Sequence, residues 1–484
     1  MKRQLFFLSL GIITLLGFLL RLYHYDMTPG WNESLDEIHY AWTGQTWLNT
    51  GIPTSWSYLS SYPTTKTIRL WNTDFRIVSP MLEKPPLYSL LSGITVLLFG
   101  QDELTEARIS TIRLLPLVLS ILSIYLTGLV GRKVFSPTVG LVGALLYATV
   151  PPFVLANRLS VTENLPTPLM LSVQLIFLTT SLPSMRPHFL LVSIFSALAI
   201  LTKQIGVVIA FSSILIFALQ KKWKPAVICT LIAGSAFFVY LLIGLYFDWD
   251  LFRTIQTEQR RIGLQGGLPQ LIQTLVSRPL ITTEKLFPDG VLLLGYLLFF
   301  VSPWLLFPPL RIRGGEGELR KSNHNPSLPP LILRGKTSFD FIVFLTFPFV
   351  YITYLVLFIT GAEPIGSGQG YWGWYAYPLF PYLTILVAYI LVKLWHSYSI
   401  FEFFITTLIL GSSLIRYFFL TLPRQYHYRW QPALMLLLVI TLATKFLPET
   451  YRKQILILLF GIFIGVNMYA SMNLSLLYST NPQP

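Results

Sequence analysis

Apolar runs of the length needed to cross a lipid bilayer recur along the whole chain. The first, "LFFLSLGIITLLGFLL" at residues 5–20, follows Lys2 and Arg3. Of the 484 residues, 53% are hydrophobic and only 12% are charged, about half the charged fraction of a soluble domain. Since about 20 apolar residues span the hydrocarbon core as a helix, the sequence predicts an all-α polytopic membrane protein.

We expect a single membrane domain, residues 1–484, with about 13 transmembrane helices. The first apolar run is expected to remain as a span, because no small-residue cleavage site of a signal peptide follows it. The predicted spans are residues 5–22, 108–131, 138–155, 164–182, 188–203, 204–220, 225–247, 290–310, 340–360, 375–395, 400–420, 431–447 and 454–477.

Positive charges set the expected orientation. With a cytoplasmic N-terminus, Lys and Arg of the short loops 132–133 and 221–224 fall on the cytoplasmic side. This orientation requires residues 87–100, "LYSLLSGITVLLFG", to lie in the interface or to re-enter, because they are too short to span. The net charge of +14 then reflects inner loops and does not indicate nucleic-acid binding. The single cysteine, Cys229, can form no internal disulfide.

Two long loops are predicted outside the membrane and one insert inside the cell. The first outer loop, 23–107, is rich in Trp and Tyr, and we expect it to form interfacial helices. The second outer loop covers 248–289. The cytoplasmic insert 311–339 contains the related stretches "PPLRIRG" and "PPLILRG", and its Gly/Pro-rich composition predicts a flexible loop.

The strongest chemical signal is "ESLDEIHYAW" at residues 33–42, just outside the first span. Asp36 and Glu37 lie there close to the membrane surface and among aromatic residues. An isolated pair of carboxylates in an outer loop is most often a solvated feature, but further charged motifs on the same face favour a functional role. His24 and His39 are near Asp36 but form only a weak metal signal. No cofactor is predicted, and a role for a divalent metal stays open.

A second motif on the same face is "EKPPLY", from Glu83 to Tyr88. Lys84 precedes two prolines and an apolar run, so its charge is expected at the membrane interface. A compact ammonium group there suits a lipid phosphate. The alternative is an ordinary lysine that snorkels to the interface at the start of a helix.

Two more charged positions lie at the predicted outer ends of spans. "ANRLSVTENLP" places Arg158 and Glu163 on either side of a short turn, where an ordinary loop is the alternative interpretation. "LTKQIG" places Lys203 between two tightly linked spans, where a charge is costly unless it is solvated or paired.

This set of charges suits group transfer from a phosphate-linked lipid. A carboxylate deprotonates or orients an acceptor hydroxyl, and cations stabilise the departing phosphate. The sequence contains no serine nucleophile elbow and no Walker A segment. The candidate catalytic residues are Asp36, Glu37 and Glu163, and the candidate donor-phosphate-binding residues are Lys84, Arg158 and Lys203.

The order of these motifs resembles a known family. "LDEIHYAW" follows the first span, "EKPPLY" precedes an apolar run ending in "LFG", and "EARISTIRLLPLVLS" enters the next span. "NRLSVTENL", "LTKQIG" and, late in the chain, "WYAYPLFPYLTIL" complete the series. The chain resembles the GT-C glycosyltransferases of the protein O-mannosyltransferase and aminoarabinose transferase type, most clearly over residues 1–220.

The resemblance implies an inverting transfer of a monosaccharide from a polyprenyl-phosphate donor to a hydroxyl group. Asp36 matches the expected catalytic base, Lys84 the lysine at the lipid phosphate, and Glu163 a second acidic position near the donor or acceptor sugar. Glu37 is expected to support the loop or the acceptor site. The supporting positions are Glu83, His39, Tyr88 and Tyr375.

Two departures from the family pattern affect these expectations. Family members often have a basic residue just before the late Tyr-x-x-Pro element, but Trp372, Gly373 and Trp374 precede Tyr375 here. A phosphate contact is therefore missing, or it is supplied by one of two later arginines, Arg416 and Arg424. The sequence ends soon after the last predicted span, so acceptor recognition is expected to rest on the two outer loops.

A transporter or lipid flippase is the main alternative function, and a non-catalytic scaffold is another. A transporter favours charges near the midplane in repeated halves, whereas the charges here cluster at span ends on one face. The expected partners are a polyprenyl-phosphate-linked sugar, a lipid, glycan or protein hydroxyl acceptor, and the membrane, without nucleic acid. The expected location is the plasma or inner membrane, with an extracytoplasmic active site.

Overall fold

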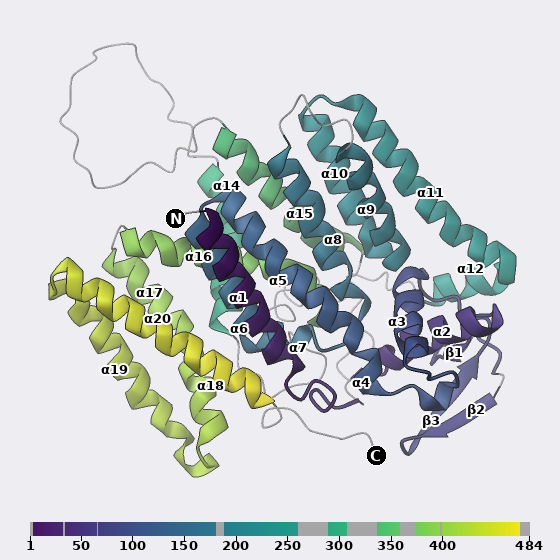
Figure 1. The fold of residues 1–484 in the computed structure, drawn as a ribbon, viewed down its shortest axis with the longest axis horizontal. Coiled ribbons are helices and arrows are strands. Elements are labelled where there is room, and N and C mark those ends of the chain that lie inside the picture. Colours follow the sequence, from purple (N-terminus) through teal and green to yellow (C-terminus); the bar gives the residue numbers. More distant parts are fainter. Residues whose placement is uncertain are drawn as a thin grey trace.

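The computed structural model describes residues 3–31, 34–64, 66–180, 188–259, 289–306, 336–358, 373–396 and 399–474. Long helices dominate this part of the chain and run side by side in one bundle (Figure 1). Among the described residues, seven helices are long and apolar enough to cross a membrane, and five shorter apolar helices accompany them. The predicted class of helical polytopic protein is confirmed, while the number of spans is not established.

Helices of the first half of the chain follow the predicted spans closely. The predicted span 138–155 is divided at Pro151, because the residue before a proline favours an extended conformation, and Val150 has ψ of 127°. These helices are α1 (Arg3–Leu22), α4 (Ile109–Ile112), α5 (Leu114–Val134), α6 (Pro137–Thr149), α7 (Pro151–Ala156), α8 (Pro166–Thr179), α9 (His188–Thr202), α10 (Val207–Leu219) and α11 (Trp223–Phe247).

The second half contains a central helix and a peripheral group. α16 (Phe380–His396) belongs to the most deeply buried of the candidate spans and packs against α6 and α14. The group α17–α20 lies on the left of Figure 1, away from the strands. The elements are α12 (Trp249–Glu258), α14 (Gly290–Leu306), α15 (Lys336–Phe358), α16, α17 (Ile400–Leu410), α18 (Ser412–Thr421), α19 (Trp430–Ala443) and α20 (Glu449–Met472).

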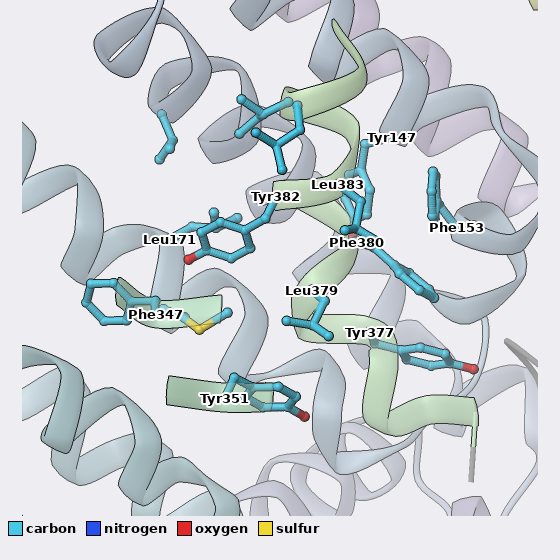
Figure 2. Packing of buried hydrophobic residues seen from close by; sticks show 14 of the residues in the cluster. Tyr147, Phe153, Leu171, Phe347, Tyr351, Tyr377, Leu379, Phe380, Tyr382 and Leu383 are labelled. Atoms are coloured by element: carbon cyan, nitrogen blue, oxygen red, sulfur yellow. The ribbon is translucent and has the colours of Figure 1, made fainter. Parts of the chain in front are cut away.

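Aromatic side chains fill the core around the start of α16. Figure 2 shows Phe380 beside Phe153 of α7, and their ring centroids are 4.8 Å apart. Tyr147 of α6 lies 5.7 Å from Phe153, so three helices meet in one aromatic cluster. Such large rings bury much apolar surface with few rotatable bonds, and they fix the N-terminal end of α16 against the N-terminal helices.

The first predicted outer loop contains two helices and a small sheet. The helices are α2 (Asp36–Thr50) and α3 (Leu87–Leu98); α3 is too short to span, as predicted for residues 87–100. The sheet was not predicted. Its antiparallel strands lie in the order β1 (Ser55–Trp56), β3 (Thr73–Val78) and β2 (Lys66–Leu70).

The sheet has a local cause in the sequence. Apolar and polar residues alternate through "KTIRL" and "TDFRIV", which is the period of a half-buried strand. The two residues between β2 and β3, Trp71 and Asn72, both have positive φ, 50° and 58°. That geometry matches the tight hairpin turn whose twist suits paired strands.

The structure describes only part of the predicted second outer loop and of the predicted cytoplasmic insert. α12 occupies the beginning of the predicted second outer loop, 248–289. Nearly all of the predicted flexible insert, 311–339, lies outside the described residues.

α2 and α3 cross with their backbones in contact at two glycines. A Cβ atom on Gly44 would lie 1.8 Å from the carbonyl oxygen of Ser89, and one on Gly93 would lie 2.3 Å from the carbonyl carbon of Gly44. These distances are far below van der Waals contact, so only glycine permits this crossing. It sets the position of the start of α2 relative to the "EKPPLY" segment.

We predict that Gly44→Ala lowers the thermal unfolding temperature of the purified protein, because the added methyl group must push the two helices apart. The matched control is Gly234→Ala in α11, where a Cβ atom meets nothing within 4 Å. The control is expected to unfold at or above the wild-type temperature, since alanine favours a helix more than glycine does. Equal unfolding temperatures for Gly44→Ala and wild type would contradict the close crossing.

Candidate functional site

The first turn of α2 separates the two neighbouring carboxylates. Asp36 is half-buried, whereas Glu37 is fully buried. Consecutive residues on an α-helix point about 100° apart, so the two side chains face different surroundings. Within the described part of the chain, no hydrogen bond or ion pair reaches the Asp36 carboxylate.

Glu37 forms a buried two-point ion pair with Arg113, at the junction of α4 and α5. Nε and Nη2 of Arg113 lie 2.9 and 2.7 Å from Oε2 and Oε1 of Glu37. Nη1 of Arg113 donates to the carbonyls of Tyr25 and Pro29, at 2.8 and 2.7 Å. The Ser160 N–H donates to Glu37 at 2.7 Å. Glu37 therefore joins three segments of the chain.

Arg113 lies within "EARISTIRLLPLVLS", but the sequence motifs alone do not identify it as a site residue. Its signal in the sequence was a charge at the entry to an apolar span, which needs a partner. The sequence does not reveal that this partner is Glu37, 76 residues away.

The segment 157–164, which carries Glu163, is clamped by polar side chains. Asn157 accepts from Nε and Nη2 of Arg21 in α1, at 3.1 and 3.0 Å, and donates to Asn164 at 2.8 Å. Asn164 donates to the carbonyls of Ala156 and Leu159. A buried irregular segment must satisfy its backbone groups internally, and these amides do so.

Arg158 lies in the same segment and is buried. Its guanidinium donates to the carbonyls of Leu20 and Arg21 at the C-terminal end of α1, at 2.7 and 3.1 Å, and to Thr28 at 3.4 Å. The last carbonyls of a helix lack partners within the helix and attract a cation. These contacts favour a structural role for Arg158 over the predicted contact with a donor phosphate.

Glu163 and Lys203 meet at the centre of the site. Lys203 Nζ lies 2.5 Å from Oε1 of Glu163, and their side chains are 9% and 1% exposed. Nζ also lies 4.6 Å from the ring centroid of Tyr375, a cation–π distance. The hydroxyl of Tyr351 donates to the Tyr375 carbonyl at 2.9 Å. Lys203 thus contacts both Glu163 and Tyr375, which come from two other motifs of the sequence.

Tyr40 connects this cluster to Asp36. It lies one turn after Asp36 on α2, and its ring packs edge-on against Tyr88 of α3 at 5.6 Å. Burial, together with the charges of Asp36 and Glu163, raises the pKa of the Tyr40 hydroxyl well above its usual value. Asp36 also lies within electrostatic range of Lys203. We define the site cluster as Asp36, Tyr40, Glu163, Lys203 and Tyr375.

The remaining predicted positions border the cluster. Lys84 is half-buried just before α3. Its neighbour Glu83 is buried and accepts from Ser57 at 2.5 Å and from Gln259 at 2.8 Å, which holds the sheet region to α12. The Tyr88 hydroxyl lies 3.1 Å from the hydroxyl of Ser160.

His39 connects the start of α2 to the small sheet. His39 Nδ1 lies 3.1 Å from the carbonyl oxygen of Trp56, so this ring joins α2 to β1. No group of three or more His, Cys, Asp and Glu residues suited to a metal ion occurs in the described ranges.

Two late arginines are predicted as alternative phosphate contacts, and the structure describes the side chain of Arg416. Arg416 of α18 is buried and pairs with Asp289 at 2.6 Å. Asp289 also caps α14, because it accepts from the Val291 N–H at 2.8 Å. This pairing favours a structural role for Arg416. Trp372 and the side chain of Arg424 lie outside the described residues.

Comparison with known proteins places the fold. Residues 83–247, about a third of the chain, match the sequence model of the family described as dolichyl-phosphate-mannose-protein mannosyltransferase. A search of curated proteins gave no match.

Three solved structures are similar over nearly the whole chain. ArnT from Cupriavidus metallidurans, bound to undecaprenyl phosphate, is 16% identical with a TM-score of 0.53, covering 99% of this chain and 77% of that one. The archaeal oligosaccharyltransferase AglB from Archaeoglobus fulgidus is 13% identical with a TM-score of 0.53, covering 99% and 57%. The arabinosyltransferase EmbB from Mycobacterium smegmatis is 11% identical with a TM-score of 0.51, covering 97% and 40%.

The chain has the fold of the GT-C glycosyltransferases, the fold that its ordered motifs predicted. The predicted resemblance to this group is confirmed by the family match and by the structural neighbours. The family match indicates a glycosyltransferase. The comparisons do not test the roles of individual site residues, which stay predictions.

We predict that Glu37→Gln lowers the stability of the protein by about 3–5 kcal/mol, because it leaves Arg113 buried without its counter-charge. Thermal and denaturant unfolding of the purified protein measure this change. The control is Asp74→Asn on β3, which loses only a loose 4.0 Å pair with Arg69 that is 67–73% exposed, so it is expected to unfold like wild type. Wild-type stability in Glu37→Gln would show that the pair does not hold these segments together.

Proposed function

We propose that this protein is an inverting glycosyltransferase that moves a monosaccharide from a polyprenyl-phosphate donor to a hydroxyl acceptor on the extracytoplasmic face of the membrane. The observation that carries the proposal is the site cluster. It brings together the half-buried carboxylate of Asp36, which has no bonded partner among the described residues, and the buried ion pair of Glu163 and Lys203 at the end of the apolar bundle. A similar structure, ArnT, binds undecaprenyl phosphate, which supports a donor of this class.

Asp36 is the proposed catalytic base. The acceptor oxygen attacks the anomeric carbon as the bond from that carbon to the phosphate oxygen breaks, and the hydroxyl proton passes to Asp36. The products are the glycosylated acceptor and the polyprenyl phosphate. One displacement inverts the anomeric centre. Because no described residue is bonded to the Asp36 carboxylate, its oxygens are available to the acceptor.

Lys84 is the proposed contact for the phosphate that leaves. The charge on this phosphate increases as the glycosidic bond breaks, and a nearby ammonium group stabilises that charge. Lys203 contributes less directly, because Glu163 already balances its charge. We propose that Lys203 and Tyr375 instead hold Glu163 in place beside the sugar, which agrees with their mutual contacts.

The orientation and location are part of the same proposal. A cytoplasmic N-terminus in the plasma or inner membrane follows from the distribution of Lys and Arg in the short loops. The site cluster and the sheet then lie on the outer side, where a lipid, a glycan or a protein hydroxyl is the proposed acceptor. The identity of the sugar and of the acceptor is left to the assay below.

We expect Asp36→Asn to lower the rate of transfer by about 10²- to 10⁴-fold, the usual contribution of a general base. The assay offers radiolabelled polyprenyl-phosphate hexoses and pentoses to the purified protein, with membrane extract as acceptor. Asp74→Asn is the matched control, an exposed carboxylate of the same loop, and should transfer at the wild-type rate. Equal transfer by a folded Asp36→Asn would remove this residue from the mechanism. If neither wild type nor Asp36→Asn transfers sugar from any donor of the panel, a transport or scaffolding function would be favoured.

Lys84→Ala should mainly weaken use of the donor. Loss of a charged hydrogen bond costs about 1.5–3 kcal/mol, so kcat/KM for the donor is expected to fall about 10- to 150-fold. Lys66→Ala, an exposed lysine on β2 of the same loop, is the control for loss of a positive charge. An unchanged kcat/KM and unchanged donor binding in Lys84→Ala would exclude the phosphate contact.

A further inference from the structure

A cavity lies away from the site cluster, between α16 and the peripheral group α17–α20. It has a volume of about 450 Å³, within the range of ligand pockets. Its walls are almost entirely apolar. Representative wall residues are Val142 of α6, Leu391 of α16, Leu410 of α17, Leu437 of α19 and Phe460 of α20.

The cavity reaches the opposite end of α16 from the site cluster. His396, the last residue of α16, lines it, whereas Tyr375 of the site cluster precedes the first residue of that helix. The helix has 17 residues, which corresponds to about 24 Å along its axis. The two regions therefore face opposite sides of the membrane layer, and the cavity does not belong to the proposed catalytic site.

The cavity also reaches the outer apolar surface of the bundle. Ile457 and Ile462 of α20 both line it, and they are 60% and 50% exposed. Neighbouring exposed residues, Met435 and Val439 on α19 and Leu458 on α20, continue the same apolar surface. In a membrane this surface faces lipid chains, so the occupant best matched to the cavity enters sideways from the bilayer.

Cationic side chains gather at the end marked by His396. Lys453 of α20 lies 5.9 Å from the ring centroid of Trp395, a wall residue, and Arg452 is adjacent in sequence. Lys393 lies next to the wall residues of α16 and pairs with Glu402 at 3.0 Å. Lys453 donates to Glu449, and its side chain is 37% exposed. An ammonium group has three N–H donors, so Lys453 can also donate to an anionic group at the level of the lipid headgroups.

We propose that this cavity binds one acyl chain of an anionic phospholipid of the bilayer, with the lipid phosphate beside His396 and Lys453. The apolar walls bind the chain, the opening at Ile457 and Ile462 admits it, and the basic end selects the headgroup. The bound lipid fills the space between α16 and α20 and so joins the peripheral group to the central helix. This site is separate from glycosyl transfer and does not depend on it.

The test is native mass spectrometry of the delipidated full-length protein with added phosphatidylglycerol or phosphatidylcholine of identical chains. Wild type is expected to retain phosphatidylglycerol in preference. Lys453→Gln should reduce that preference about fivefold, the effect of one cation at a lipid surface. Lys224→Gln, an exposed lysine of α11, is the matched control and should leave the preference unchanged.

Two cavity-filling variants, Val466→Phe and Thr407→Phe, replace wall residues on different helices and should lose both lipids while they keep the wild-type unfolding temperature in detergent. Equal retention of the two phospholipids by wild type, or full retention in both folded cavity-filling variants, would overturn the proposal. Displacement of phosphatidylglycerol by added polyprenyl phosphate at equal concentration would also overturn it, because the occupant would then be the polyprenyl lipid. Asp36→Asn is expected to retain phospholipid like wild type.

Discussion

The buried ion pair of Glu37 and Arg113 is the interaction on which the candidate site depends. Removing two charges from water is costly, and only good geometry with further hydrogen bonds offsets that cost. Arg113 places three of its nitrogens on Glu37, Tyr25 and Pro29, while Ser160 donates to the same carboxylate. The start of α2, the entry to α5 and the segment that carries Glu163 are thereby held in one arrangement.

Neighbouring residues in this site have different tasks because a helix turns their side chains apart. Glu37 is buried and pairs with Arg113. Asp36 is half-buried and has no bonded partner among the described residues. The same division applies to the cations. Arg158 satisfies the end of α1 and Arg416 balances Asp289, so both arginines have structural partners. A charge buried within a membrane protein is costly unless it is paired.

α16 connects the two functional regions that we propose. Tyr375, just before its N-terminal end, contacts Lys203, and Phe380 at that end belongs to the aromatic cluster of Figure 2. Its other end borders the apolar cavity and the basic residues near His396. The helix is buried for most of its length and packs against α6 and α14. Chemistry on one side and lipid contact on the other are compatible in one fold because a rigid helix separates them.

The sequence by itself determined the helical membrane class, most helix positions and the ordered motifs, because hydrophobic length and charge placement are local properties. It also selected Glu163, Lys203 and Tyr375, which the structure brings into contact. Only the tertiary structure decided that Glu37 pairs with Arg113 and that Arg158 caps α1. A buried charge is costly unless it has a partner. The partners of these arginines lie 76 and 137 residues away in the sequence, so only the folded chain shows which residues pair.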